Sequence, residues 1–227
     1  MAFVFDPPPQ PAARIAGGGL FPVRRIFCIG RNYADHVREM GGDPKAQPPV
    51  FFTKPADAIV ADGSVIPYAQ ATDDLHYEGE LVVALKDGGK NIAPGKTDDL
   101  IFGYAAGCDL TRRDHQRRAK DAGAPWDTAK GFDQSAPLGD IIRAEEAGDL
   151  SAAQLKTAVN GETRQSAPLS QMIWSVGDII AALSEQFELK AGDLIFTGTP
   201  EGVGPLRRGD EVAIEIGPCS LHFRIGE

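Results

Sequence analysis

The stretch LHYEGELVVAL, residues 75–85, decides the fold and raises the main functional question. From Leu81 onward the residues are almost all apolar, which is typical of a strand buried on both faces. Glu78 and Glu80 stand two residues apart at the start of this run. In a strand they point to the same face, about 6.5 Å apart along the chain. Two like charges beside a buried strand are costly, so we expect a compensating positive charge nearby.

The composition is that of an ordinary globular protein. The 227 residues are 42% hydrophobic and 24% charged, which argues against disorder and is sufficient for one large domain. The net charge is −9 and no basic block occurs, so we expect neither nucleic acid nor a membrane as a partner. The N-terminus lacks the pattern of a signal peptide, and no apolar run reaches the roughly 18 residues of a membrane span. Three widely spaced cysteines predict reduced thiols in a cytoplasmic protein: Cys28, Cys108 and Cys219.

Local signals indicate short strands joined by turns. Residues 24–30 and 50–55 are short, largely apolar segments that end at Gly and Pro, and they predict strands. Asn160-Gly161, between two further strand segments, is a strong signal for a hairpin with a type I′ turn. The predicted strands outnumber the helices, so we expect one mixed α/β, β-dominated domain.

Local signals also predict helices, one of which ends at Gly123, and an N-terminal arm. Asn32 is suited to cap a helix over residues 32–41, and Ser175 is suited to cap an amphipathic helix over residues 175–187. The first twenty residues are rich in Pro, Ala and Gly, which predicts a flexible N-terminal arm over residues 1–20.

A divalent cation would offset the charge of Glu78 and Glu80. Carboxylates without other ligand types favour hard ions such as Mg²⁺, Mn²⁺ or Ca²⁺. Asp109 ends another apolar strand, where an acid is equally out of place, and it is the candidate for a third ligand. Zinc is disfavoured because no His/Cys cluster has ligand spacing. Spacing alone leaves open a solvated pair of glutamates, which is the commoner meaning of such a pattern.

Other polar residues in apolar company point to catalysis. His36 and Glu39 are three residues apart on a predicted helix, so their side chains can hydrogen-bond and form a general base. The competing interpretation is a surface helix with an unrelated His and Glu. Lys54 and Lys130 each follow a short apolar segment, and taken singly such lysines are expected to be solvated.

Seven motifs, taken together and in their order, resemble the fumarylacetoacetate hydrolase family. The resemblance runs from about Phe21 to the C-terminus, and it is strongest to the fumarylpyruvate and acylpyruvate hydrolases of that family. The motifs are GRNYADHVREMG, FFTKPADA, LHYEGELVVAL, GYAAGCDLTRRDHQ, WDTAKGFDQSAPLG, VNGETRQ and LIFTGTPEGVGP.

The resemblance implies a rolled mixed β-sheet with short peripheral helices, a catalytic domain over residues 21–227, and a homodimer. It implies a Mg²⁺ or Mn²⁺ ion as cofactor and a small 2,4-dioxo acid as substrate. It also implies roles for nine side chains: Glu78, Glu80 and Asp109 as metal ligands, His36, Glu39 and Lys130 as catalytic residues, and Arg113, Gln116 and Thr199 as substrate contacts.

The expected reaction is hydrolysis of a carbon–carbon bond in an acylpyruvate, with fumarylpyruvate giving fumarate and pyruvate in the catabolism of aromatic compounds. Alternatives on the same scaffold are decarboxylation of oxaloacetate and decarboxylation or isomerisation of hydroxylated dienedioic acids. A non-catalytic metal-binding protein is the alternative from another class. The presence of both His36 and Glu39 favours hydrolysis. Tyr77 and Gly79 depart from the residues common in the family, and Gly79 is expected to loosen its strand locally.

Overall fold

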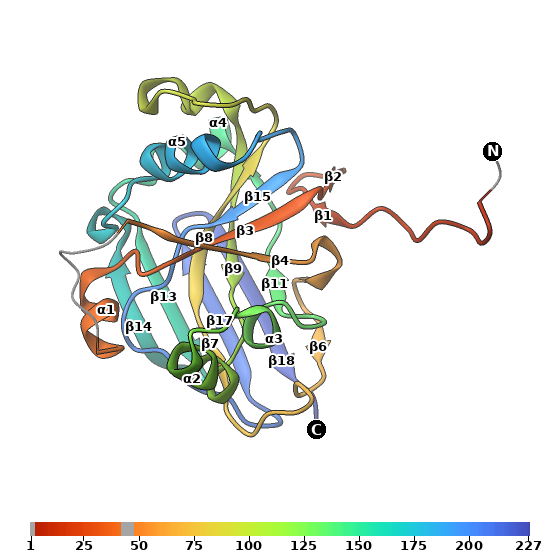
Figure 1. Ribbon diagram of the computed structural model, residues 1–227, viewed down its shortest axis with the longest axis vertical. Helices are drawn as coiled ribbons and strands as arrows, with labels where there is room; N and C mark the ends of the chain where they lie inside the picture. Colours follow the sequence, from red (N-terminus) through yellow and green to blue (C-terminus); the bar gives the residue numbers. More distant parts are fainter. Residues whose placement is uncertain (1–2, 42–47) are drawn as a thin grey trace.

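The computed structural model describes residues 3–41 and 48–227 (Figure 1). The stretch GGDPKAQPP, residues 41–49, whose Pro and Gly content is typical of a loop, lies mostly outside the described residues. Within the described ranges the chain is β-rich, and its helices are short. The α-helices are α1 (Ala34–Glu39), α2 (Arg113–Ala122), α3 (Asp127–Lys130), α4 (Ala144–Ala147) and α5 (Val176–Gln186). Single 3₁₀ turns are η1 (Ala56–Ala58), η2 (Pro94–Lys96), η3 (Asp98–Leu100) and η4 (Leu169–Gln171).

The largest sheet has eight strands of mixed direction. Its main path, in spatial order, is β4 (Val50–Lys54), β3 (Arg25–Gly30), β15 (Asp193–Phe196), β8 (Gly79–Leu85), β9 (Ile101–Cys108), β11 (Ala136–Leu138) and β5 (Ile59–Ala61). The eighth strand, β12 (Ile142–Arg143), also pairs with β9. The strand predicted at residues 81–85 therefore lies at the centre of the sheet, and every residue of β8 is buried.

A five-stranded sheet packs against part of the large one, and two small sheets complete the fold (Figure 1). The five strands are β14 (Glu162–Pro168), β13 (Gln154–Val159), β17 (Glu211–Ile216), β18 (Cys219–Ile225) and β6 (Val65–Ile66). The small sheets are β10 (Thr111–Arg112), β7 (Leu75–Tyr77) and β16 (Gly204–Pro205), and the pair β1 (Ala12–Arg14) and β2 (Leu20–Pro22).

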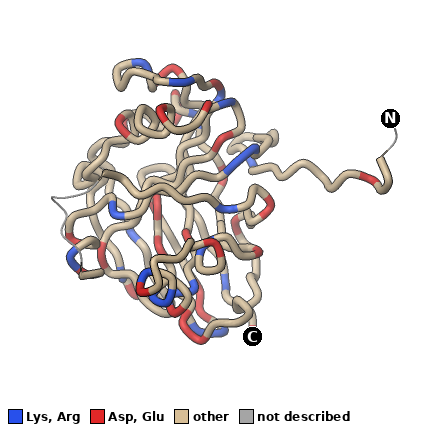
Figure 2. The backbone as a smooth tube through the Cα atoms, viewed as in Figure 1, with Lys and Arg blue, Asp and Glu red and all other residues tan. Residues whose placement is uncertain are grey.

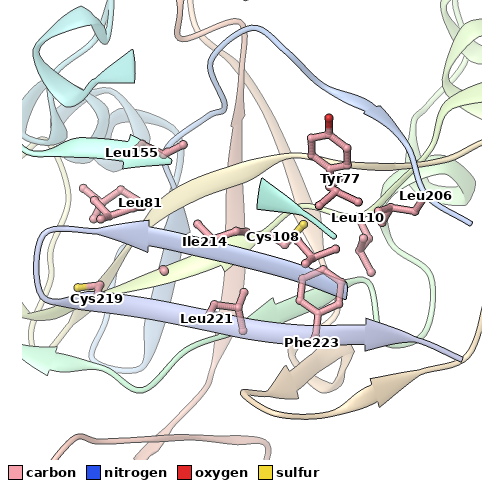
Figure 3. Packing of buried hydrophobic residues seen from close by; sticks show 14 of the residues in the cluster. Tyr77, Leu81, Cys108, Leu110, Leu155, Leu206, Ile214, Cys219, Leu221 and Phe223 are labelled. Carbon is pink, nitrogen blue, oxygen red and sulfur yellow. The ribbon is translucent and has the colours of Figure 1, made fainter. Parts of the chain in front are cut away.

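The two main sheets share the largest hydrophobic cluster. Leu81 of β8 meets Leu155 of β13, Ile214 of β17 and Leu221 of β18, and Figure 3 shows these side chains between the strands. Further along β8, Val83 and Leu85 join a second cluster beneath α5. The apolar run therefore contributes to separate cores along its length, which explains why it shows no alternation with polar residues.

Most local predictions are confirmed. Strands occupy residues 25–30 and 50–54, and Asn160 and Gly161 both have positive φ in the hairpin that joins β13 to β14. Ser175 caps α5 in a capping box with Asp178. The three cysteines are free and buried. No helix among the described residues is long and apolar enough to cross a membrane.

Two of the predictions about helices and strands are wrong. Asn32 does not cap α1: it is fully buried, and its side-chain amide donates to the carbonyl oxygens of Trp174 and Thr197, which ties the chain before α1 to two distant segments. Residues 12–14, placed in the predicted arm, form β1 because Ala13 is buried against the large sheet. Residues 3–11 contain no helix or strand, and the part before Gln10 extends away from the body (Figure 1). The division into arm and catalytic domain otherwise stays a prediction.

Gly79 does not loosen its strand; it allows a close approach of the two sheets. A Cβ at this position would lie 2.1 Å from Thr157 Oγ1 on β13. The Gly79 N–H also donates to Gln165 Oε1 on β14, at 3.0 Å. Because β8 carries Glu80 immediately afterwards, the distance between the sheets fixes where that carboxylate lies.

Replacing Gly79 by Ala should destabilise the protein by about 1–3 kcal/mol, because the added methyl group overpacks the space in front of Thr157. Thr157 Oγ1 has no hydrogen-bond partner among the described residues, so Thr157→Ala alone should cost only about 1 kcal/mol. Urea unfolding of both single variants and the double variant measures the coupling. If the cost of Gly79→Ala is the same in the Thr157→Ala background, the steric explanation is wrong.

Candidate active site

Three buried carboxylates meet at the ends of the two central strands. Glu78 precedes β8, Glu80 is its second residue, and Asp109 follows β9. The antiparallel pairing of β8 with β9 places Asp109 opposite Glu78, and the Asp109 N–H donates to the Glu78 carbonyl oxygen at 2.8 Å. Ligand oxygens of the three acids lie within 4.8 Å of one another. The predicted same-face arrangement of the two glutamates is thus confirmed.

Buried cations surround these carboxylates. Lys130 Nζ lies 2.7 Å from Glu78 Oε2 and 2.6 Å from Asp109 Oδ2, and it also donates to Thr111 Oγ1. Arg113 donates to the other oxygen of Glu78, at 2.6 Å. The ion pairs are shielded from water, because both cations are at most 3% exposed. The three donors of the Lys130 ammonium are therefore all directed at protein groups.

Burial and neighbouring charges together shift the pKa values of these buried groups. Burial would raise the pKa of Glu78, but Lys130 and Arg113 lower this pKa far below its usual range. Burial raises the pKa of Glu80 well above its ordinary value, and the negative charges of Asp109 and Glu78 raise it further. Burial would lower the pKa of Lys130, yet the same two acids raise it. Near neutral pH, Lys130 is thus an ammonium, Glu78 is a carboxylate, and Glu80 takes up a proton most readily.

The three acids fit a divalent cation. Carboxylate oxygens are the donors that Mg²⁺ and Mn²⁺ prefer. Asp109 Oδ1 lies 2.8 Å from Lys54 Nζ but accepts no well-directed hydrogen bond from the described residues, so it keeps lone-pair density for a ligand. Glu80 Oε2 is held in place by the Gly198 N–H at 2.8 Å. A cation would remove the repulsion that raises the pKa of Glu80.

A histidine–glutamate pair stands at the same pocket. His36 on α1 is 8% exposed, and its Nδ1 lies 3.1 Å from Glu39 Oε2. The other oxygen of Glu39 accepts from the Gly202 N–H at 3.1 Å. Burial alone would raise the pKa of Glu39, but the hydrogen bonds from His36 and Gly202 lower it, so this group is a carboxylate at neutral pH. Such a carboxylate holds the imidazole in one orientation.

The structure brings the nine predicted residues together. One pocket is lined by all of them except Glu39, which is hydrogen-bonded to the pocket residue His36. Gln116 Oε1 accepts from Arg113 at 2.5 Å, so its amide N–H groups are left without a described acceptor. The hydroxyl of Thr199 donates to the Gly79 carbonyl oxygen and accepts from Gln165, which ties this residue to the protein on both sides.

Two residues of the site were not identified from the sequence. Lys54, expected to be solvated, is buried on β4 and donates to the carbonyl oxygens of Leu110 and Lys130, next to its ion pair with Asp109. Gln165 holds both Gly79 and Thr199. The sequence holds a weak signal that Lys54 is buried, because Lys54 lies two residues from Phe52 and so shares one face of the predicted strand with an aromatic side chain. Gln165 had none, because its partners lie 34 residues or more away along the chain.

A buried carboxylate triad, backed by buried cations and faced by a histidine–glutamate pair, forms a site on a β-rich roll that could hold a divalent metal ion. The chain belongs to the fumarylacetoacetate hydrolase family: residues 25–226 match the family described as fumarylacetoacetate (FAA) hydrolase C-terminal. The family and fold implied by the sequence motifs are thus confirmed.

Named relatives carry two activities. The crystal structure of fumarylpyruvate hydrolase from Pseudomonas aeruginosa, in complex with Mn²⁺ and pyruvate, is 44% identical, covers 99% of each chain and superimposes with a TM-score of 0.97. The mitochondrial oxaloacetate tautomerase FAHD1 of Mus musculus is 41% identical over 89% of this chain and 91% of its own. The oxaloacetate tautomerase YcgM of Escherichia coli is 39% identical over 90% of this chain and 94% of its own.

Replacing Glu80 by Gln should stabilise the metal-free protein and abolish its response to metal. The pKa of Glu80 is raised above its ordinary value of 4.5, so its charged form destabilises the fold increasingly as pH rises above that value. Glu80→Gln should therefore raise the free energy of unfolding at pH 8 by roughly 1–3 kcal/mol, and by less at pH 5.

Thermal melts with and without Mn²⁺ test this expectation. Wild-type protein should show a higher Tm in Mn²⁺, whereas Glu80→Gln should not. Glu185→Gln, which removes an exposed carboxylate from α5, is the matched control and should retain the shift. A full Mn²⁺ shift in Glu80→Gln would show that this residue is not a ligand.

Proposed function

We propose that the protein hydrolyses a carbon–carbon bond in a 2,4-dioxo acid, with fumarylpyruvate giving fumarate and pyruvate. The observation that carries the proposal is the position of His36, hydrogen-bonded to Glu39 and lining the same pocket as the three carboxylates. A base beside a metal centre is the arrangement that water activation needs. The identity and coverage shared with the Pseudomonas aeruginosa enzyme support the choice of substrate.

In this proposal His36 acts as the general base. Glu39 accepts a hydrogen bond from Nδ1–H, which leaves the lone pair of Nε2 to take a proton from water. The water oxygen bonds to C4 of the substrate, the C3–C4 bond breaks, and its electron pair becomes the enolate of pyruvate. Proton transfer from the imidazolium to C3 then yields pyruvate and restores His36. A divalent cation held by Glu78, Glu80 and Asp109 would polarise the 2-oxo and carboxylate oxygens and stabilise the enolate charge.

Lys130 contributes a fixed positive charge in this scheme rather than a proton. The raised pKa keeps the Lys130 amine protonated. The hydrogen bonds from Lys130 to Glu78 and Asp109 hold two of the three proposed metal ligands in place. The free amide N–H groups of Gln116 are available to a substrate oxygen. The hydroxyl hydrogen of Thr199 is already donated to the Gly79 carbonyl oxygen. In this proposal Thr199 therefore contacts the substrate as part of the pocket lining and not as a hydrogen-bond donor.

Oxaloacetate is the second candidate substrate. Two relatives of about 40% identity are named oxaloacetate tautomerases, and oxaloacetate shares the 2-oxo acid group that the carboxylate site would accommodate. Tautomerisation moves a proton between C3 and an oxygen, for which His36 alone could serve. Decarboxylation of oxaloacetate also passes through pyruvate enolate and needs no activated water. The homodimer and the cytoplasmic location stay predictions.

Assays on metal-stripped protein separate these candidates. Fumarylpyruvate, acetylpyruvate and oxaloacetate are supplied in parallel, with Mg²⁺ or Mn²⁺ added back, and pyruvate release and enol–keto conversion are followed. Metal-dependent release of fumarate and pyruvate, well above the rates on the other two, is the expected result. Fast oxaloacetate conversion with little hydrolysis of either acylpyruvate would show that the proposed reaction is wrong.

His36→Asn should lower kcat for fumarylpyruvate about 10²- to 10⁴-fold, because the general base is lost. The Mn²⁺-induced shift in Tm should stay, since His36 makes no hydrogen bond to any of the three carboxylates in the part of the chain that the structure describes. His222→Asn, at an exposed position on β18, is the control and should leave both unchanged. Unaltered hydrolysis in His36→Asn would exclude the assigned base.

A further inference from the structure

The wall of the active-site pocket carries a lysine that the mechanism above does not use. Lys120, on α2, lines the pocket together with the metal-binding carboxylates. It is half-buried, and its Nζ lies 5.7 Å from the centre of the Trp126 ring. Over residues 3–41 and 48–227 the structure shows no carboxylate paired with it, although burial of an unpaired ammonium is unfavourable.

The other cations near the end of α2 have partners. Arg117 pairs with Asp74 at 2.8 Å, and Arg118 lies 3.5 Å from Asp114. Figure 2 accordingly shows acidic and basic residues side by side around this helix. Lys120 thus differs from Arg117 and Arg118, because its side chain lines the pocket whereas theirs pair with carboxylates.

The position of Lys120 follows from the helix. Arg113, Gln116 and Lys120 are spaced three and four residues apart, so they share one face of α2. At 1.5 Å per residue, Lys120 lies about 10 Å further along the axis than Arg113. Arg113 is 3% exposed and contacts Glu78, whereas Lys120 is half-buried. The row formed by Arg113, Gln116 and Lys120 therefore runs from the carboxylate cluster toward the solvent.

The charge around Lys120 favours an anion. Burial lowers the pKa of Lys120, and the positive charges of Arg113 and Arg31 lower it further. Arg31 lines the same pocket. Lys120 has no carboxylate partner within residues 3–41 and 48–227, so an anionic group bound beside its ammonium would supply the opposite charge.

We propose that Lys120 binds the distal carboxylate of a dicarboxylic substrate whose 2-oxo acid end lies at Glu78, Glu80 and Asp109. The inference rests on the proposed function and adds to it the residue that selects a diacid over a monoacid. A seven-carbon diacid such as fumarylpyruvate spans roughly 7.5 Å between its terminal carbons, which is comparable to the row from Arg113 to Lys120. Acetylpyruvate shares the reacting end but has no distal carboxylate.

The test compares two substrates on three variants of the Mn²⁺-loaded protein. Lys120→Gln should lower kcat/KM for fumarylpyruvate about 10- to 100-fold, because a charge-assisted hydrogen bond is lost. For acetylpyruvate the change should be less than about threefold. Lys120→Arg, which keeps the charge, should recover most of the rate on fumarylpyruvate. Arg118→Gln removes an equal charge from the exposed side of α2 and should affect neither substrate.

The outcomes separate the possible errors. An equal loss on both substrates in Lys120→Gln would mean that Lys120 supports the pocket through its packing on Trp126, and it would overturn the inference. An unchanged rate on fumarylpyruvate would overturn it as well. If the wild-type protein hydrolyses neither acylpyruvate, the proposed function is wrong and the inference falls with it.

Discussion

The site depends on a balance between three buried carboxylates and three buried cations. Glu78, Glu80 and Asp109 face Lys54, Lys130 and Arg113, and each of these six side chains is at most 5% exposed. Ions are costly to remove from water, and their mutual attraction compensates only when the geometry is well fixed. The fold supplies that geometry from separate elements, since the carboxylates come from the central strands and the cations from β4, α2 and α3. A divalent cation held by the carboxylates would add two positive charges to this balanced set, and an anionic ligand would offset them.

The sequence predicts those features that local periodicity determines. Two residues of separation place Glu78 and Glu80 on one face, because side chains of a strand alternate. Three residues of separation bring His36 and Glu39 together on a helix. Asp109 was found because an acid at the end of an apolar strand is unusual, but its place opposite Glu78 is set by the register of β8 with β9, which no local pattern contains.

The features that could not be predicted are those decided by distant partners. Lys54 resembles any lysine that follows an apolar segment, and only the approach of Asp109 makes it a buried ion-pair partner. Asn32 has the residue type of a helix cap, yet its amide is used to bind segments near residues 174 and 197. The need for glycine at position 79 arises from Thr157 on another sheet. In each case a local preference is overridden by a tertiary contact.

The loop after β15 contacts both halves of the site. The Gly198 N–H holds Glu80, and the Gly202 N–H holds Glu39 four residues later. Tyr77 anchors the same loop by donating to the Gly202 carbonyl oxygen at 2.8 Å. The two carboxylates come from different elements. Glu80 belongs to the central strand β8 of the large sheet, whereas Glu39 ends α1 and accepts its hydrogen bond from the loop at an exposed position. The one loop thus sets the spacing between the carboxylate cluster and the histidine–glutamate pair, so a change in its backbone would displace both halves of the site together.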